Sequence, residues 1–144
     1  MKNIGIKWKN NWVEKVIFKG ENLRMEECKI KNMYDLNHTI AKELLEKHEY
    51  PWEVLPEISD FIIELGNKLD KEIYELKGEN IWIAKSAIIY PSAYIKGPAI
   101  IGENAEVRHC AFIRGNAIVG NYAVVGNSTG LYNVILFYFV TVED

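Results

Sequence analysis

Residues 83–130 read IAKSAI, IYPSAY, IKGPAI, IGENAE, VRHCAF, IRGNAI, VGNYAV and VGNSTG, which are eight successive six-residue units. Every unit begins with isoleucine or valine, and Leu131 begins the next one. A second series stands four residues after the first: Ala87, Ala93, Ala99, Ala105, Ala111, Ala117 and Ala123, then Thr129 and Ile135. This period fits neither an α-helix, which repeats every 3.6 residues, nor a simple strand, which repeats every two. It predicts one short strand and one turn per unit, with the aliphatic side chain pointing inward.

Glycine and asparagine occupy many of the positions between the two series. They are Gly97, Gly102, Asn104, Gly115, Asn116, Gly120, Asn121, Gly126 and Asn127. Both residue types tolerate the backbone conformations that tight corners need. The pattern therefore predicts a chain that turns sharply after each short strand.

With these units the segment resembles the bacterial hexapeptide-repeat transferases, whose parallel β-helix has three six-residue units per triangular coil. The resemblance implies a mainly β fold: a short left-handed parallel β-helix of about three coils over residues 83–136, preceded by an α-helical N-terminal segment. The left hand is implied by the resemblance alone, because crossovers between parallel strands are otherwise right-handed. Coils stacked about 4.8 Å apart give a prism roughly 15 Å tall.

The first half of the chain has a different composition. Residues 1–80 hold 29 of the 37 charged side chains, and two amphipathic helices are predicted there. The first carries Leu36, Ile40, Ala41, Leu44 and Leu45 after Asp35 or Asn37 as N-cap, and Pro51 stops it. The second follows Ser59 as N-cap and carries Phe61, Ile62, Leu65 and Leu69.

These patterns divide the chain into an N-terminal extension (1–32), an α-helical cap (33–80) and a hexapeptide-repeat β-helix (81–144). Residues 1–24 are compatible with an edge strand, a short helix or an extension. An uncapped terminal coil exposes unpaired backbone and apolar side chains. We therefore expect the two helices to cover one end of the β-helix.

Composition excludes several classes of function. Seventeen Lys and Arg against twenty Asp and Glu leave a net charge of -3, so the sequence predicts no nucleic-acid binding. No apolar run is long enough to cross a membrane, and the N-terminus lacks the pattern of a secretory signal, so we expect no membrane partner and a cytoplasmic protein. Cys28 and Cys110 are too few for a disulfide scaffold and are expected to be free.

A narrower resemblance covers about three quarters of the chain. The segments MYDLNHTIAKELLEK (33–47), YPWEVLPEISDFIIELG (50–66) and GPAIIGENAEVRHCAFIRGNAIVGNYAVVGNS (97–128) are similar to single-domain relatives of the UDP-N-acetylglucosamine pyrophosphorylase/glucosamine-1-phosphate acetyltransferase. This narrower resemblance implies an acyltransferase-like domain of sugar-nucleotide biosynthesis, with acetyl-CoA and an amino-sugar phosphate as ancestral ligands. The chain has no Gly-rich nucleotide-binding signature, so a nucleotidyltransferase activity is implied by the family name alone.

The resemblance also implies site residues. Arg114 in FIRG matches the phosphate-binding arginine, and Arg108 and His109 in VRHC are further candidates for a ligand contact or for mere surface packing. Relatives place a lysine after VGNS, where this chain has Gly130 and Tyr132 in GLYN. Their catalytic histidine follows VILF, where this chain continues YFVTVED and Asp144 takes the position. We therefore expect no catalytic residue, a shortened C-terminus and an inactive domain.

The repeat is also compatible with two other functions. Hexapeptide folds include zinc enzymes that use three histidines, but His109 alone lies in the repeat, so no metal is expected. The second reading is a non-catalytic trimerisation or scaffold module, because a short prism has a large surface for its volume. The apolar run VILFYFVTV (134–142) looks like an uncovered terminal strand. It predicts a homo-oligomer, a homotrimer by family resemblance, in which this strand is buried.

Overall fold

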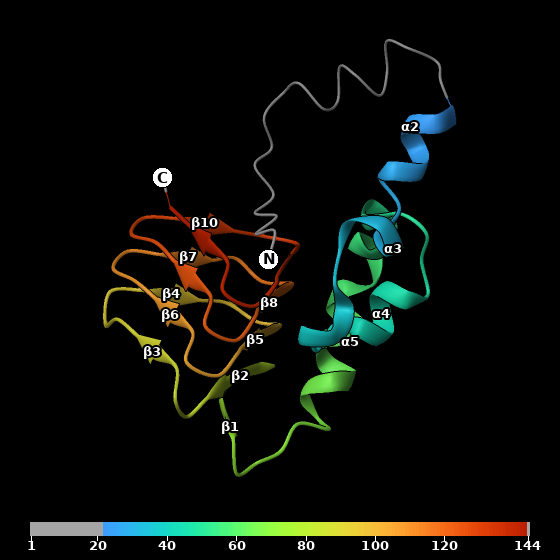
Figure 1. The fold of residues 1–144 in the computed structure, drawn as a ribbon. Helices are drawn as coiled ribbons and strands as arrows, with labels where there is room; N and C mark the ends of the chain where they lie inside the picture. Colours follow the sequence, from blue (N-terminus) through green and yellow to red (C-terminus); the bar gives the residue numbers. More distant parts are fainter. Residues whose placement is uncertain (1–21, 144) are drawn as a thin grey trace.

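The computed structural model of the protein describes residues 22–143, with side chains from Met25 onward. A helical cap and a β-solenoid lie side by side (Figure 1). The helical elements are α2 (Asn22–Glu27), α3 (Ile30–Met33), η1 (Leu36–His38), α4 (Lys42–Glu46), η2 (Pro51–Glu57) and α5 (Ile58–Gly66), where η marks a 3-10 helix. The strands are β1 (Tyr74–Gly78), β2 (Ile81–Ala84), β3 (Ile88–Ile89), β4 (Tyr94–Ile95), β5 (Ala99–Ile101), β6 (Glu106–Val107), β7 (Phe112–Ile113), β8 (Ala117–Val119), β9 (Val124–Val125), β10 (Gly130–Leu131), β11 (Val134–Leu136) and β12 (Thr141–Val142).

The repeat units form three parallel sheets around one interior. Sheet A has the order β1-β2-β5-β8-β11, sheet B has β12-β9-β6-β3, and sheet C has β10-β7-β4. As far as β10, paired residues are 18 apart, so that Ile88 lies opposite Glu106 and Tyr94 lies opposite Phe112. Strands β2 to β10 make three coils, and β11 and β12 begin a fourth. The predicted mainly β fold, a solenoid of about three coils behind a helical segment, is confirmed.

Both six-residue series line the solenoid interior. The inner cluster consists of Ala99, Ile101, Ala105, Val107, Ala111, Ile113, Ala117, Val119, Ala123, Val125, Leu131 and Leu136. Thr129 takes an alanine position, and its buried Oγ1 has no hydrogen-bond partner among the described residues. The narrow interior thus explains the alternation, because a small residue in one series leaves room for a branched one in the other.

The last coil is one residue shorter than the others. β11 pairs Val134 with Ala117, and β12 pairs Thr141 with Val124, so these partners are 17 residues apart. The corner between sheets C and A has three residues, 114–116, in one coil and two, 132–133, in the next. Val134 therefore occupies the alanine position. The prediction that Ile135 continues this series is wrong, and Ile135 packs against the helical cap instead.

The helices cover the outer side of sheet A and not an end of the solenoid, so this prediction is corrected (Figure 1). One outward residue per coil is apolar on this sheet, and strand pairing aligns these residues in a row: Trp82, Ile100, Ile118 and Ile135. The row shares a single apolar cluster with Leu44, Ile58 and Ile62 of the cap. Covering a row of four apolar side chains removes more apolar surface from water than covering one coil end, which explains the lateral position.

The first predicted helix is divided in two. The chain is extended at Thr39, whose Oγ1 accepts the N–H of Ala41 at 3.2 Å, so residues 36–45 form η1 and then α4. Asp35 is an N-cap as expected, although of η1, and its side chain accepts the N–H of Asn37 at 3.0 Å. The side chain of Thr39 therefore competes with the continuous helix that the apolar spacing predicts.

The second predicted helix begins earlier than expected. η2 leads directly into α5, whose N-cap is Glu57, so Ser59 lies in the first turn and caps nothing. Strand β1 lies within residues 33–80, which were expected to be helical. It pairs antiparallel with β2, with Tyr74 opposite Ala84, and so shields the edge of sheet A at the first coil.

The apolar run at residues 134–142 forms two strands and not one. β11 and β12 lie in different sheets, and residues 137–140 form the corner between them. The rings of Tyr34 and Phe137 stack with centroids 5.0 Å apart, so this corner also contacts the cap. The expectations for residues 1–21 and for Asp144 lie outside the described residues.

Candidate functional site

The corner after sheet C brings two cations and an aromatic ring together. Lys96, Arg114 and Tyr132 follow β4, β7 and β10 at 18-residue intervals, so they stand on successive coils. They line an open depression of about 610 Å³, together with Phe112, Ser128 and Gly130. All of these residues are exposed, and strand pairing fixes the backbone beneath them.

Among the described residues, no carboxylate neutralises either cation of this depression. No carboxylate lines the depression, and within residues 22–143 neither Lys96 nor Arg114 forms an ion pair. The Arg114 guanidinium carbon lies 5.7 Å from the ring centre of Tyr132, within the range of a cation–π contact. Two cations on neighbouring coils can donate charge-assisted hydrogen bonds to one anionic group.

Lys96 was not identified from the sequence. The resemblance stated above implies a lysine one coil after Arg114, where this chain has Tyr132, whereas Lys96 lies one coil before Arg114. The 18-residue interval between Lys96 and Arg114 was the available signal. Because one coil contains three six-residue units, outward-facing residues 18 apart are expected to lie on neighbouring coils. Comparing the outward positions at this interval would have identified Lys96.

Arg108 lies at a different corner and is already paired. Its Nε is 2.9 Å from Glu106, and its Nη1 is 2.8 Å from Glu143. The hydrogen bond that Arg108 donates to Glu106 is the main cause that raises the pKa of Arg108 above its ordinary value. An anionic ligand at Arg108 would compete with two carboxylates, so Arg114 is the better candidate of the two.

His109 stands beside Arg108 at the corner between sheets B and C. Its Nδ1 is 2.9 Å from Ser92 Oγ, and the ring of Tyr90 meets it edge-on at 4.5 Å. Ser92 Oγ also accepts the N–H of Cys110 at 3.1 Å. The three predicted site residues are therefore split, with Arg108 and His109 at one corner of the prism and Arg114 at another.

The described part of the chain offers few other kinds of site. It contains no group of three His, Cys, Asp or Glu side chains placed to hold a metal ion. None of its helices is long and apolar enough to cross a membrane. Both cysteines are free, with Cys28 buried and Cys110 exposed.

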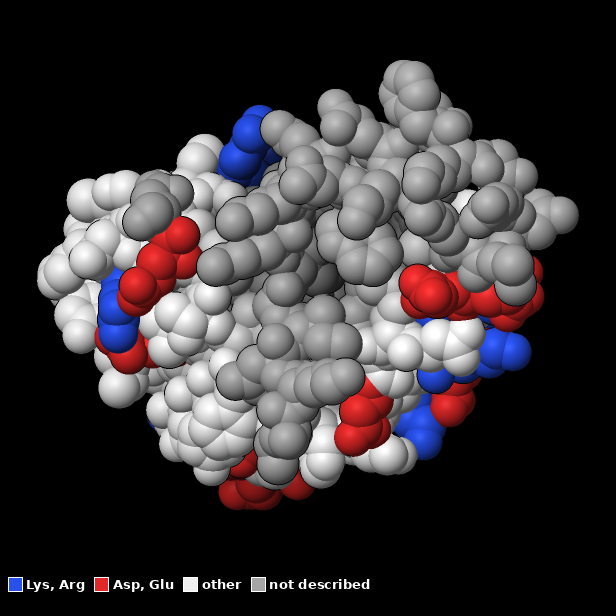
Figure 2. Space-filling view, turned by 45° about the horizontal axis from the view of Figure 1, so that its top comes forward, with Lys and Arg blue, Asp and Glu red and all other residues white. Residues whose placement is uncertain are grey.

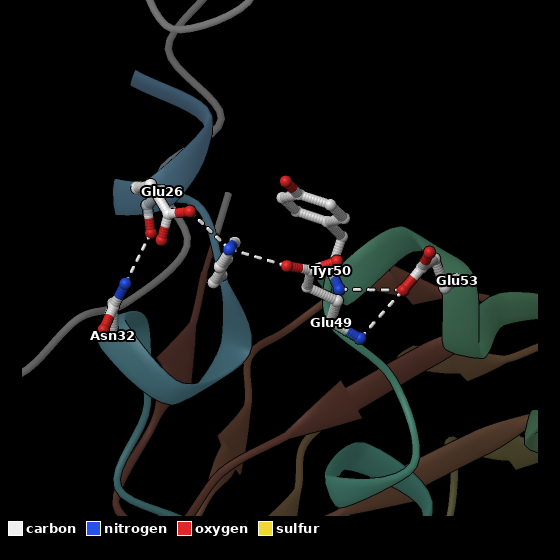
Figure 3. Close-up of polar contacts among 6 residues, drawn as sticks. Glu26, Asn32, Glu49, Tyr50 and Glu53 are labelled. Carbon is white, nitrogen blue, oxygen red and sulfur yellow. Dashed lines mark hydrogen bonds and ion pairs between the residues drawn. The ribbon is translucent and has the colours of Figure 1, made fainter. Parts of the chain in front are cut away.

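Several charged side chains on the cap form ion pairs with one another. In Figure 2, acidic and basic groups lie next to one another on the helical side and also at one place on the solenoid side. Figure 3 shows one such group: Lys29 bridges Glu26 and Glu49, and Glu53 accepts the backbone N–H groups of Glu49 and Tyr50. A smaller depression of about 440 Å³ beside this group is lined by charges of both signs. One of its cations, Lys29, is paired with Glu26 and Glu49, unlike Lys96 and Arg114.

The contact of Glu53 with the backbone gives a pH-dependent prediction. The N–H groups of Tyr50 and Glu49 hold the pKa of this carboxyl below its ordinary value. A lowered pKa means that the stabilisation is complete above about pH 4.3, where an unfolded glutamate titrates, and is lost as the pH falls further. Glu53→Gln should therefore lower the melting temperature more at pH 7 than at pH 3.

Thermal unfolding followed by circular dichroism over this pH range measures the effect. Glu72→Gln is the matched control, because Glu72 is exposed and its side chain forms no ion pair with a described residue. A difference between wild type and Glu53→Gln that is the same at pH 7 and pH 3 would contradict the assignment.

No protein-family model, no curated protein and no solved structure matches this chain. The β-solenoid and the geometry of the Lys96–Arg114 corner are therefore the observations on which a function must rest.

Proposed function

We propose that this chain is a hexapeptide-repeat acyltransferase-like domain related to sugar-nucleotide biosynthesis, which binds a phosphate-bearing ligand at Lys96 and Arg114. Acetyl-CoA and an amino-sugar phosphate are the ligands that the family resemblance suggests. The observation that carries the proposal is the pair of unneutralised cations on successive coils of the solenoid. A phosphate group between them would accept hydrogen bonds from both.

We infer binding without acetyl transfer. In the family that the chain resembles, the general base is a histidine, which must lie within hydrogen-bond reach of the reacting amine. His109 is the histidine of the repeat, and it contacts Ser92 at a different corner from Arg114. His38 and His48 belong to the cap, where they contact Tyr138 and Glu57. No histidine among residues 22–143 lines the depression.

Charge-removing substitutions should abolish phosphate binding selectively. Hydrogen bonds to charged groups contribute about 1.5–3 kcal/mol each, so Arg114→Gln and Lys96→Gln should each weaken binding of glucosamine 1-phosphate roughly 10- to 100-fold. Titration calorimetry with glucosamine 1-phosphate and with acetyl-CoA measures this. Arg108→Gln is the matched control, because Glu106 and Glu143 already occupy that arginine.

The Arg108→Gln control also shows which results would contradict the proposed anion site. If neither ligand releases heat with the wild type, or if Arg108→Gln weakens binding as much as Arg114→Gln, the anion site is not at the Lys96–Arg114 corner. Raised salt should weaken the wild-type affinity, since exposed charges are screened by ions.

A second candidate function is a non-catalytic module that self-associates as a homotrimer. The observation in its favour is the aromatic pair on the outer side of sheet C: Tyr94 is 61% exposed, Phe112 is 42% exposed, and their rings meet edge-on at 5.4 Å. Exposed aromatic residues are typical of interfaces between subunits. Light scattering coupled to size exclusion should then give a trimer that Tyr94→Ser weakens. A monomer that persists at every concentration would exclude this role.

A further inference from the structure

The Lys96–Arg114 depression also contains an uncharged, open position at Gly130. Gly130 lies opposite Phe112 in the pairing of β10 with β7 and takes the third position of the outward row that begins with Tyr94. A Cβ atom built on Gly130 meets no atom within 4 Å. The outward row is therefore interrupted at Gly130, and an open slot remains where Tyr94 and Phe112 carry rings.

Two aromatic side chains border this slot. Phe112 is 42% exposed on one side of Gly130, and Tyr132, which is 56% exposed, follows two residues later along the chain. Ser128 lies on the opposite side and adds a hydroxyl group. The slot thus combines aromatic walls with the two cations, Lys96 and Arg114, at its margin.

We propose that the slot over Gly130 holds the planar ring of a nucleoside monophosphate while Lys96 and Arg114 bind its phosphate. Aromatic side chains stack on the face of any nucleobase, and neighbouring cations bind phosphate oxygens. This inference rests on the anion site proposed above and adds to it the chemical class of the group attached to the phosphate. Gly130 is the specificity-determining residue, because a side chain there would fill the slot.

Gly130 permits a selective test. Its side-chain space is open and its φ is not in the left-handed region, so Gly130→Leu fills the slot without displacing the backbone. Gly130→Ala is the graded control, since a methyl group fills only part of the slot. Circular dichroism and the urea midpoint verify that both variants fold.

Titrations with adenosine 5′-monophosphate, ribose 5-phosphate and inorganic phosphate separate the two contributions. We expect the wild type to bind adenosine monophosphate about tenfold more tightly than ribose 5-phosphate, since stacking of one base is worth that factor or more. Gly130→Leu should remove this preference, so that adenosine monophosphate and ribose 5-phosphate bind with similar affinities, whereas Arg114→Gln should weaken both.

The outcomes that overturn the proposal are distinct. Equal affinities of the wild type for adenosine monophosphate and ribose 5-phosphate, or an adenosine monophosphate affinity that Gly130→Leu leaves intact, overturn the ring slot but leave the anion site standing. Absence of binding by all three phosphates overturns both.

Discussion

Replacing Ile118 with aspartate should detach the helical cap from the solenoid. Ile118 is 0% exposed, lies in the outward row of sheet A and packs in one cluster with Ile58 and Ile62. Truncation of such a side chain to alanine costs about 2–5 kcal/mol, and a buried unpaired carboxylate costs more. Because a domain has about 5–15 kcal/mol of total stability, Ile118→Asp should remove much of it or unfold the cap altogether.

Ile88 provides a matched control for this substitution. It is also an outward isoleucine of a short strand, but it lies on sheet B and is 58% exposed. Ile88→Asp should change the free energy of unfolding by no more than about 0.5 kcal/mol. Urea denaturation measures both variants, and limited proteolysis reports whether the cap is released. Equal losses for the two variants would show that sheet A is not the face that the cap covers.

The contrast between Ile118 and Ile88 also explains why the position of the helical cap could not be predicted from the six-residue period. The six-residue period predicted the solenoid and the inward series, because every face of the prism needs the same small and branched residues inside. The period does not distinguish the faces. Only the 18-residue interval does, since it separates the apolar outward row of sheet A from the mixed outward residues of sheets B and C. The lateral position of the helices followed from that longer interval.

The candidate site was also predicted only in part from the sequence. Arg114 was predicted through family resemblance, and the structure adds Lys96, Tyr132 and the open position of Gly130 around it. Local sequence could not reveal this grouping, because its members come from three coils and are neighbours only when the coils stack. Arg108 and His109 precede Arg114 in the same coil but lie at another corner, whereas Lys96 is a whole coil away in sequence and lines the same depression, so sequence distance within a solenoid is a poor guide to spatial distance.

Gly66→Ala should destabilise the protein, against the usual effect of this substitution in a helix. Alanine is favoured over glycine by about 1 kcal/mol in a helix interior, and because Gly66 is the last residue of α5, the helix by itself would gain at most this much. However, a Cβ atom on Gly66 would lie under 3.0 Å from the indole ring of Trp82. Trp82 is 6% exposed and belongs to the row that α5 covers, so its ring has little room to move. Overpacking of this kind costs about 1–3 kcal/mol, and we expect the loss to exceed the gain.

A double-mutant cycle separates the two effects. Trp82→Leu makes room beside Gly66 and by itself should cost several kcal/mol, about as much as other truncations of buried aromatic residues. In that background Gly66→Ala should become neutral or stabilising, because the helical preference for alanine remains and the clash is gone. Urea unfolding of the four proteins gives the coupling free energy. If Gly66→Ala costs the same with Trp82 and with leucine at that position, α5 does not rest on the indole ring, and the lateral packing of the cap must have another origin.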